Sequence, residues 1–133
     1  MTEPRGHLEL RTLAMPANTN PSGDIFGGWI MSLMDLAAGM SGARQAGGRV
    51  VTAAASHLAF LAPVKVGDIV CCYAELLRVG RTSMTFGVEV WVLRQRKGAR
   101  SKVTEAEFTM VAIDEEGRPK PIVVESVGEQ VVE

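Results

Sequence analysis

Asp35 is the residue whose surroundings first suggest chemistry. It is the only charged side chain between Asp24 and Arg44, in a stretch made almost wholly of apolar and small residues. A carboxylate is costly to place among apolar side chains unless it has partners or a task. We therefore predict that Asp35 is catalytic, as a general base on water or as a nucleophile. The structural alternative is that it caps a helix or pairs across an interface between chains.

The double glycine Gly27-Gly28 opens the same apolar segment. The first N–H groups of a helix have no acceptor within the helix, and the helix dipole favours negative charge there. Glycine also lets a substrate approach the backbone closely. This pair can therefore form an oxyanion hole for a carbonyl under attack. Double glycines also occur for packing or for turns, and that interpretation remains open.

Asn20 lies before Pro21 in the polar turn that precedes the glycines. Its amide could hold a water molecule or donate to a carbonyl oxygen, but Asn-Pro is also a common way to start a turn. Asp24 stands just before the expected helix, where carboxylates commonly serve as caps. We expect Asp24 to be a cap or a structural loop residue and not a catalyst.

The spacing of these groups suggests a site made from two chains. Asp35 is eight residues beyond Gly27, which is about 12 Å along a helix axis. One helix therefore cannot easily bring both to a single carbonyl carbon. Two antiparallel helices can, with Asp35 of one facing the glycines of the other. We expect a composite site at a two-fold interface and an inactive monomer.

The elements that must position these residues can be predicted from periodicity. Residues 27–45 have helical spacing, with Ile30, Leu33 and Met34 on one side and small residues such as Ser41 and Gly42 opposite. A helix so apolar all round is expected to be buried. Strands are predicted at residues 7–15, 50–61, 68–79, 82–94 and 102–114. This order indicates an α+β hot-dog fold, a long antiparallel sheet wrapped around one helix.

Length and composition limit the function classes. The 133 residues suit one domain, with an acidic tail at 118–133 whose order the sequence leaves open, and a net charge of −1 gives no sign of nucleic-acid or membrane attraction. The only cysteines, Cys71 and Cys72, are adjacent and are expected to pack as small apolar side chains. The sequence shows no signal peptide or membrane span, so a cytoplasmic protein is expected.

Longer blocks of the sequence resemble the YciA-type acyl-CoA thioesterases of the hot-dog superfamily. The resemblance extends from about residue 10 to 120. Its blocks are Thr12-Leu-Ala-Met-Pro16, Asn20-Pro-Ser-Gly-Asp-Ile-Phe-Gly-Gly-Trp-Ile-Met-Ser32, Met34-Asp35, Arg49-Val-Val-Thr52, Phe60-Leu-Ala-Pro-Val64, Val66-Gly-Asp-Ile-Val-Cys-Cys-Tyr73, Gly80-Arg-Thr-Ser83 and Val88-Glu-Val-Trp-Val92.

The resemblance implies hydrolysis of short-to-medium-chain acyl-CoA without a metal or organic cofactor. It implies that Asp35 and Asn20 are catalytic and that the thioester carbonyl is polarised near Gly27 and Gly28. It also implies a dimer with antiparallel helices, assembled into a hexamer as a trimer of dimers, with sites at the dimer interface.

The corner Gly80-Arg81-Thr82-Ser83 is the candidate contact for CoA, because it offers a guanidinium, two hydroxyls and exposed backbone to phosphate or pantetheine. In the similar family this region lies near the path of CoA. By itself, Arg81 is also compatible with an ordinary solvated turn. The basic segment at residues 94–100 is expected to be a solvated hairpin tip.

His57 departs from the family pattern, as do Ser56 before it and Ala62 before the proline. We expect His57 to be structural. Two other functions remain open: a hot-dog enoyl-thioester hydratase with His57 as its only candidate base, and a non-catalytic acyl-CoA-binding sensor. Serine hydrolase, P-loop and metal-cluster motifs are absent from the sequence. Acyl-chain preference, regulation and pathway stay undetermined.

Overall fold

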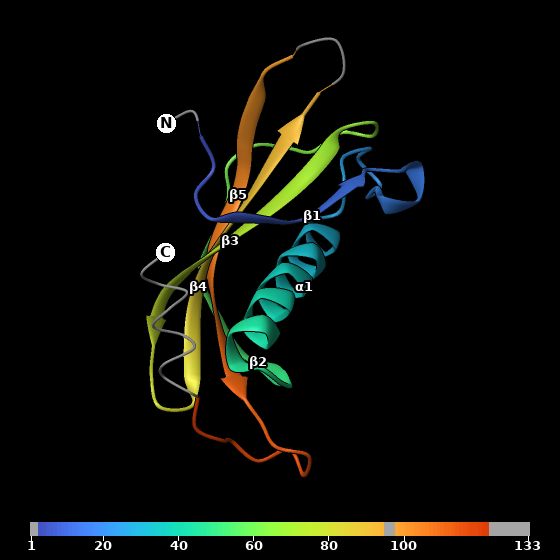
Figure 1. The fold of residues 1–133 in the computed structure, drawn as a ribbon. Helices are drawn as coiled ribbons and strands as arrows, with labels where there is room; N and C mark the ends of the chain where they lie inside the picture. The colour runs from blue at the N-terminus through green and yellow to red at the C-terminus, as the bar shows by residue number, and fades with distance from the viewer. Residues whose placement is uncertain (1–2, 95–97, 123–133) are drawn as a thin grey trace.

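The computed structural model describes residues 3–94 and 98–122 of the chain. Within these residues an antiparallel sheet packs one of its faces against a single long helix (Figure 1). In chain order the elements are β1 (His7–Leu13), the short 3-10 helix η1 (Pro16–Asn18), α1 (Gly27–Ala46), β2 (Val50–Phe60), β3 (Ile69–Val79), β4 (Ser83–Leu93) and β5 (Arg100–Ala112). The strand order is β1-β3-β4-β5-β2. The predicted hot-dog architecture is confirmed.

Alternation along β4 divides the sheet into two faces. Its residues Phe86, Val88, Val90 and Val92 are buried in the core beneath α1, while Trp91 packs on the opposite face. Cys72 and Cys71 follow the same alternation on β3, and both are buried free thiols. Burial, with Cys71 as a lesser cause, raises the pKa of Cys72 to about 12. Both cysteines therefore pack as apolar residues, as predicted.

Small residues let α1 approach the sheet closely. The buried side of the helix carries Ile30 and Met34 together with Ala38, Ser41 and Gly42. A Cβ atom on Gly42 would lie 3.4 Å from Cγ2 of Val50. The prediction that the small residues lie opposite the large ones was wrong, because close packing on a sheet requires them on the same side.

The helix is also not buried all round within one chain. The side away from the sheet exposes Met31 (37%) and Leu36 (54%), and Phe26 just before the helix is 55% exposed. One sheet can cover only one side of a helix, so this second apolar side needs another surface to cover it.

The second uncovered surface is the edge strand β2, which pairs only with β5. Its residues Val51 to Leu58 are exposed, and the strand contains neither lysine nor proline. Long apolar edges without such protection are suited to pairing with another strand. The helix of the described chain is not long and apolar enough to cross a membrane.

The predicted segment ends differ from the structure by a few residues. β1 ends at Leu13 and β5 begins at Arg100. The backbone N–H of Ile122 donates to the carbonyl of Arg81, so the start of the predicted tail is held against the β3–β4 turn. Arg96, Lys97 and residues 123–133 lie outside the described residues.

Candidate active site

Asp35 projects from the uncovered side of α1 toward the beginning of β2. The hydroxyl of Thr52 donates a hydrogen bond to Oδ1 of Asp35 at 2.5 Å. A groove of about 540 Å³ runs between helix and strand at this point. Its lining is Asp35, Leu36, Gly39, Met40, Ala43, Arg49, Val50, Val51, Thr52 and Met110. The carboxylate is thus exposed within one chain, in a groove whose lining is mostly apolar apart from Arg49 and Thr52.

Thr52 is a site residue to which the sequence analysis gave no role. Its position in the Arg49-Val-Val-Thr52 block was the available signal. The contact joins residues 17 positions apart, so helical or strand periodicity could not reveal it.

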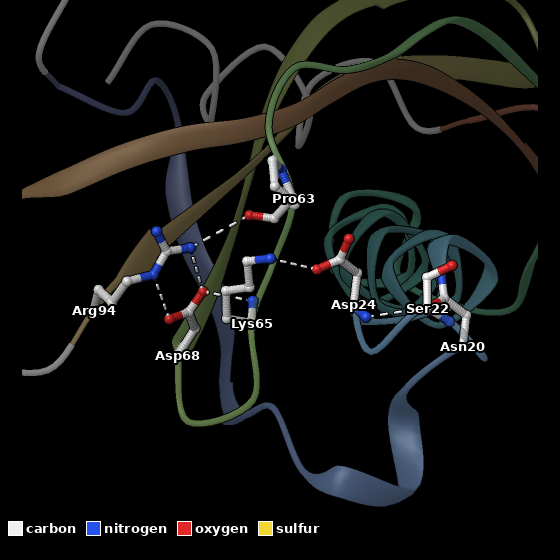
Figure 2. Close-up of polar contacts among 7 residues, drawn as sticks. All are labelled: Asn20, Ser22, Asp24, Pro63, Lys65, Asp68 and Arg94. Atoms are coloured by element: carbon white, nitrogen blue, oxygen red, sulfur yellow. Dashed lines mark hydrogen bonds and ion pairs between the residues drawn. The ribbon is translucent and has the colours of Figure 1, made fainter.

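Asn20 uses its two amide atoms differently (Figure 2). Its Oδ1 accepts hydrogen bonds from the N–H groups of Ser22 (2.9 Å) and Asp24 (3.2 Å). Its Nδ2 has no acceptor among the residues that the structure describes. The oxygen therefore forms the turn and the nitrogen remains able to donate. Both interpretations of Asn20 fit this structure, except that its amide oxygen is not free to hold a water molecule.

Asp24 is a structural loop residue and not a helix cap. Its Oδ1 pairs with Nζ of Lys65 at 2.5 Å (Figure 2). The residue at the N-cap position is Phe26, and no side chain caps the helix there. The N–H of Ile25 donates to the carbonyl of Val64 at 2.9 Å. These contacts fix the loop that carries Asn20 against the segment before β3.

Asp68 anchors that second segment. It is 1% exposed, accepts two hydrogen bonds of 2.8 Å from the Arg94 guanidinium, and accepts one of 2.9 Å from the N–H of Lys65 (Figure 2). Burial alone would raise the pKa of Asp68, but Arg94 and the Lys65 N–H outweigh it and hold the pKa below the ordinary value. Asp68 is therefore ionised, and its network supports the loop on which Asn20 lies.

The start of α1 carries two free backbone donors. The Phe26 carbonyl accepts from Trp29 and Ile30, whereas the N–H groups of Gly27 and Gly28 have no acceptor in the described part of the chain. The first turn contains no acidic residue. These donors and the helix dipole can therefore stabilise a developing oxyanion.

One chain does not bring all the predicted site residues together. Asn20 and the glycines lie at the start of α1, and Asp35 lies about two turns further along. The turn that carries Gly80, Arg81, Thr82 and Ser83 is at the end of the sheet where α1 finishes (Figure 1). Arg81 is exposed there, while the backbone of the turn is hydrogen-bonded from Gly80 to Ser83.

His57 lies away from these groups. Its Nδ1 is 3.8 Å from Oε1 of Glu107. Glu107 alternates along β5 with the core residues Ala106 and Phe108, so the pair is on the sheet face opposite α1. A histidine and carboxylate are present, as a hydratase requires, but they do not face the free donors of the helix.

Comparison with known proteins agrees with this geometry. Residues 22–99 match the model of the thioesterase superfamily. The acyl-CoA thioester hydrolase YciA of Escherichia coli is 51% identical over 125 residues, covering 92% of this chain and 95% of that protein.

Solved structures show the same similarity. A hexameric thioesterase from Yersinia pestis is 50% identical with a TM-score of 0.86, covering 91% of this chain and 98% of that one. A hexameric hotdog fold thioesterase of Campylobacter jejuni is 39% identical with a TM-score of 0.86, covering 95% and 96%. With the hot-dog sheet, the uncapped helix start and the matched sequence all in agreement, the chain belongs to the thioesterase superfamily.

Proposed function

We propose that this protein hydrolyses acyl-CoA thioesters at an active site completed by a second copy of the chain. The observation that carries this proposal is the separation of two half-sites on α1. The free donors of Asn20, Gly27 and Gly28 lie at its start, and Asp35 lies about two turns further on. Each half lacks what the other supplies.

The uncovered surfaces fit a partner that completes the site. Met31 and Leu36 are exposed on the same helix as Asp35, and β2 is an unprotected sheet edge. Antiparallel packing of two helices covers the first surface and brings Asp35 of one copy toward the glycines of the other. A two-fold axis then creates two identical sites. The hexameric state of similar thioesterases supports a trimer of such dimers.

The chemistry follows from the charges. The thioester oxygen accepts hydrogen bonds from the Gly27 and Gly28 N–H groups and from Nδ2 of Asn20. Asp35, oriented by Thr52, accepts a proton from a water molecule as the water oxygen attacks the carbonyl carbon. The tetrahedral intermediate then collapses, breaking the carbon–sulfur bond. The leaving thiolate takes the proton from Asp35, which yields the free acid and CoA.

Direct attack by Asp35 through a mixed anhydride is the second route to the same products. The two routes differ in where the oxygen of water enters. After a single turnover in isotopically labelled water, label in the Asp35 carboxylate indicates attack by Asp35. Label only in the fatty acid is produced both by general-base catalysis and by an anhydride that water opens at its acyl carbonyl, so only label in Asp35 separates the two routes.

The Gly80-Arg81-Thr82-Ser83 turn is the proposed contact for the CoA phosphates. Arg81 is exposed at a sheet corner, and a guanidinium is suited to phosphate. This turn is at the end of the sheet opposite the start of its own α1 (Figure 1). In an antiparallel dimer it serves the partner's helix start.

Subunit complementation tests the composite site. Asp35→Asn and Asn20→Ala are expected to be inactive alone. Mixed within one dimer, they leave one intact site, with Asp35 from one chain and Asn20 from the other. Random mixing should restore about a quarter of the wild-type activity. No recovery in demonstrably mixed dimers, or full turnover by a monomer, would show that the site belongs to one chain.

Substrate assays separate the enzyme from the alternatives. Free thiol is expected from saturated acyl-CoA and is expected to disappear with Asp35→Asn. Water addition to 2-enoyl-CoA without thiol release would indicate a hydratase instead. Binding of acyl-CoA with neither reaction would indicate a sensor.

A further inference from the structure

We infer that the cleft between Gly27 and Thr104 receives the acyl chain, and that the Thr104 hydroxyl selects acyl groups carrying a hydrogen-bonding oxygen. This inference rests on the proposed thioesterase function. It concerns the preference of the enzyme for hydroxyacyl and oxoacyl thioesters over unsubstituted acyl thioesters of the same length.

The cleft begins at the free N–H group of Gly27. It has a volume of about 350 Å³, and its walls are largely apolar, including Ile25, Ile30, Phe60, Leu61 and Val64. A carbonyl oxygen bound at Gly27 therefore has an apolar space beside it for the chain attached to that carbonyl. A Cβ atom at Gly27 would lie 3.4 Å from the Phe60 ring, so any other residue there would narrow the entrance.

Thr104 is the unexplained polar residue of this cleft. It is 1% exposed, and its Oγ1 has no hydrogen-bond partner among residues 3–94 and 98–122. Leaving a buried hydroxyl unpaired is unfavourable and is rare in native proteins. Apart from the Gly27 N–H, two polar groups around the cleft are paired: the Ile25 N–H with the Val64 carbonyl at 2.9 Å, and the Pro63 carbonyl with Arg94 at 3.3 Å.

The cross-strand side chains beside Thr104 offer its hydroxyl no partner. In the sheet it lies between Val90 of β4 and Phe60 of β2, and both side chains are apolar. The same face of β5 continues with Ala106 and Phe108 in the core. Valine has the same shape and suits a strand, so packing alone does not account for a threonine here.

A ligand group in the cleft accounts for it. The hydroxyl can donate to an oxo group or exchange a hydrogen bond with a hydroxyl group of the acyl chain. A saturated chain excludes water from the cleft and leaves Thr104 unpaired. Sites built to bind a polar group discriminate against the analogue that lacks it more strongly than apolar pockets reject an added hydroxyl.

The test measures kcat/KM for butyryl-CoA, 3-hydroxybutyryl-CoA and 3-oxobutyryl-CoA. In Thr104→Val, the preference for the oxygenated substrates relative to butyryl-CoA should fall about tenfold, the effect of one hydrogen bond. Thr104→Ser keeps the hydroxyl and should keep the preference. Because Thr104→Val removes an unpaired buried group, its Tm should rise by roughly 3–5 °C, which also shows that the variant folds.

Thr109→Val is the matched control. It makes the same change on the same strand, but the Thr109 hydroxyl contacts Thr85, 3.3 Å away, on the other sheet face. It should leave the substrate preference unchanged. If Thr104→Val changes all three substrates equally, the hydroxyl serves a bound water or the fold alone, and the inference is overturned. If the wild type releases thiol from no thioester at all, the proposed function itself fails.

Discussion

The hydroxyl of Thr52 donates to the carboxylate of Asp35 across the junction of α1 and β2. Asp35 comes from the uncovered side of the helix, and Thr52 comes from the exposed edge strand. One carboxylate oxygen is held by this bond, and the other has no hydrogen-bond partner in the described part of the chain, so it can accept from a water molecule. The exposed side of α1 and the edge strand β2, which are both expected to contact a partner chain, therefore also contact each other at Asp35, the proposed base.

Removing the Thr52 hydroxyl tests this orientation. Thr52→Val should lower kcat about tenfold with little change in KM, because the carboxylate remains but is no longer held. Asp35→Asn should lower kcat by about 10²–10⁴-fold, the usual contribution of a general base. Steady-state kinetics with butyryl-CoA checks both. Thr52→Ser is the control and should retain near-normal kcat; equal kcat for Thr52→Val and wild type would contradict the positioning role.

Asn20 can be tested by changing only the atom that is free. Asn20→Asp keeps the oxygen that accepts from Ser22 and Asp24 but removes the Nδ2 donor. It also places negative charge beside the oxyanion. We expect kcat to fall by about 10²–10³-fold, as for loss of an oxyanion-hole donor, with an unchanged Tm. If Asn20→Asp and Asn20→Ala both lower Tm and leave kcat intact, Asn20 serves only the turn.

Local patterns in the sequence were sufficient to predict the elements of the fold. Strand alternation, as at Phe86 to Val92, and the helical spacing after Gly27 follow from backbone geometry, which is a local property. Periodicity did not predict which face of α1 meets the sheet, because both sides are apolar and the helix was expected to be buried all round. The sheet-facing side is the one whose small residues, such as Gly42, allow the helix to approach the strands closely. A hydropathy pattern does not show how closely two elements can pack.

The sequence predicted individual residues of the site but not the contacts between them. Asp35 and the glycines stand out by type and position, whereas Thr52 and Thr104 are ordinary strand residues in the sequence. Asp24 and Lys65 are 41 positions apart, and their pairing depends on how two loops meet. Such contacts depend on how segments far apart in the sequence pack together, which a local sequence pattern does not show.

The stability supplied by Asp68 should depend on pH. Its pKa is lowered in the folded protein from an ordinary value of 3.8, because the effects of Arg94 and the Lys65 N–H exceed that of burial. A lowered carboxyl pKa stabilises the fold fully at pH well above 3.8. That stabilisation is lost as the pH falls through the folded-state pKa.

Asp68→Asn should therefore be less stable than the wild type by about 1–3 kcal/mol at pH 7. The difference should shrink as the pH falls below 3.8. Urea unfolding at a series of pH values measures this difference in stability. Glu89→Gln, which neutralises a second carboxyl with a lowered pKa, is measured in the same way for comparison. A difference that is independent of pH would show that Asp68 contributes by packing and not by charge.

His57 should be replaceable by glycine with a gain in stability. Among the described residues, His57 is the one non-glycine residue with a positive φ, at +55°. It lies within the irregularity between Ser56 and Ala59, on the exposed edge of the sheet. The left-handed conformation costs an L-residue about 1–2 kcal/mol. Glycine removes that cost but loses about 0.5–1 kcal/mol through the greater freedom of the unfolded chain.

The net gain for His57→Gly is about 0.5 kcal/mol by this difference. The 3.8 Å contact with Glu107 offsets little of it, because exposed ion pairs contribute weakly and Glu107 keeps its pair with Arg78. The Tm is to be compared at equal protein concentration, since assembly also stabilises the fold. Ser56→Gly is the matched control: it lies next in the strand without positive φ and should lose stability. A fall in Tm for His57→Gly as large as for Ser56→Gly would show that the histidine side chain itself stabilises this edge.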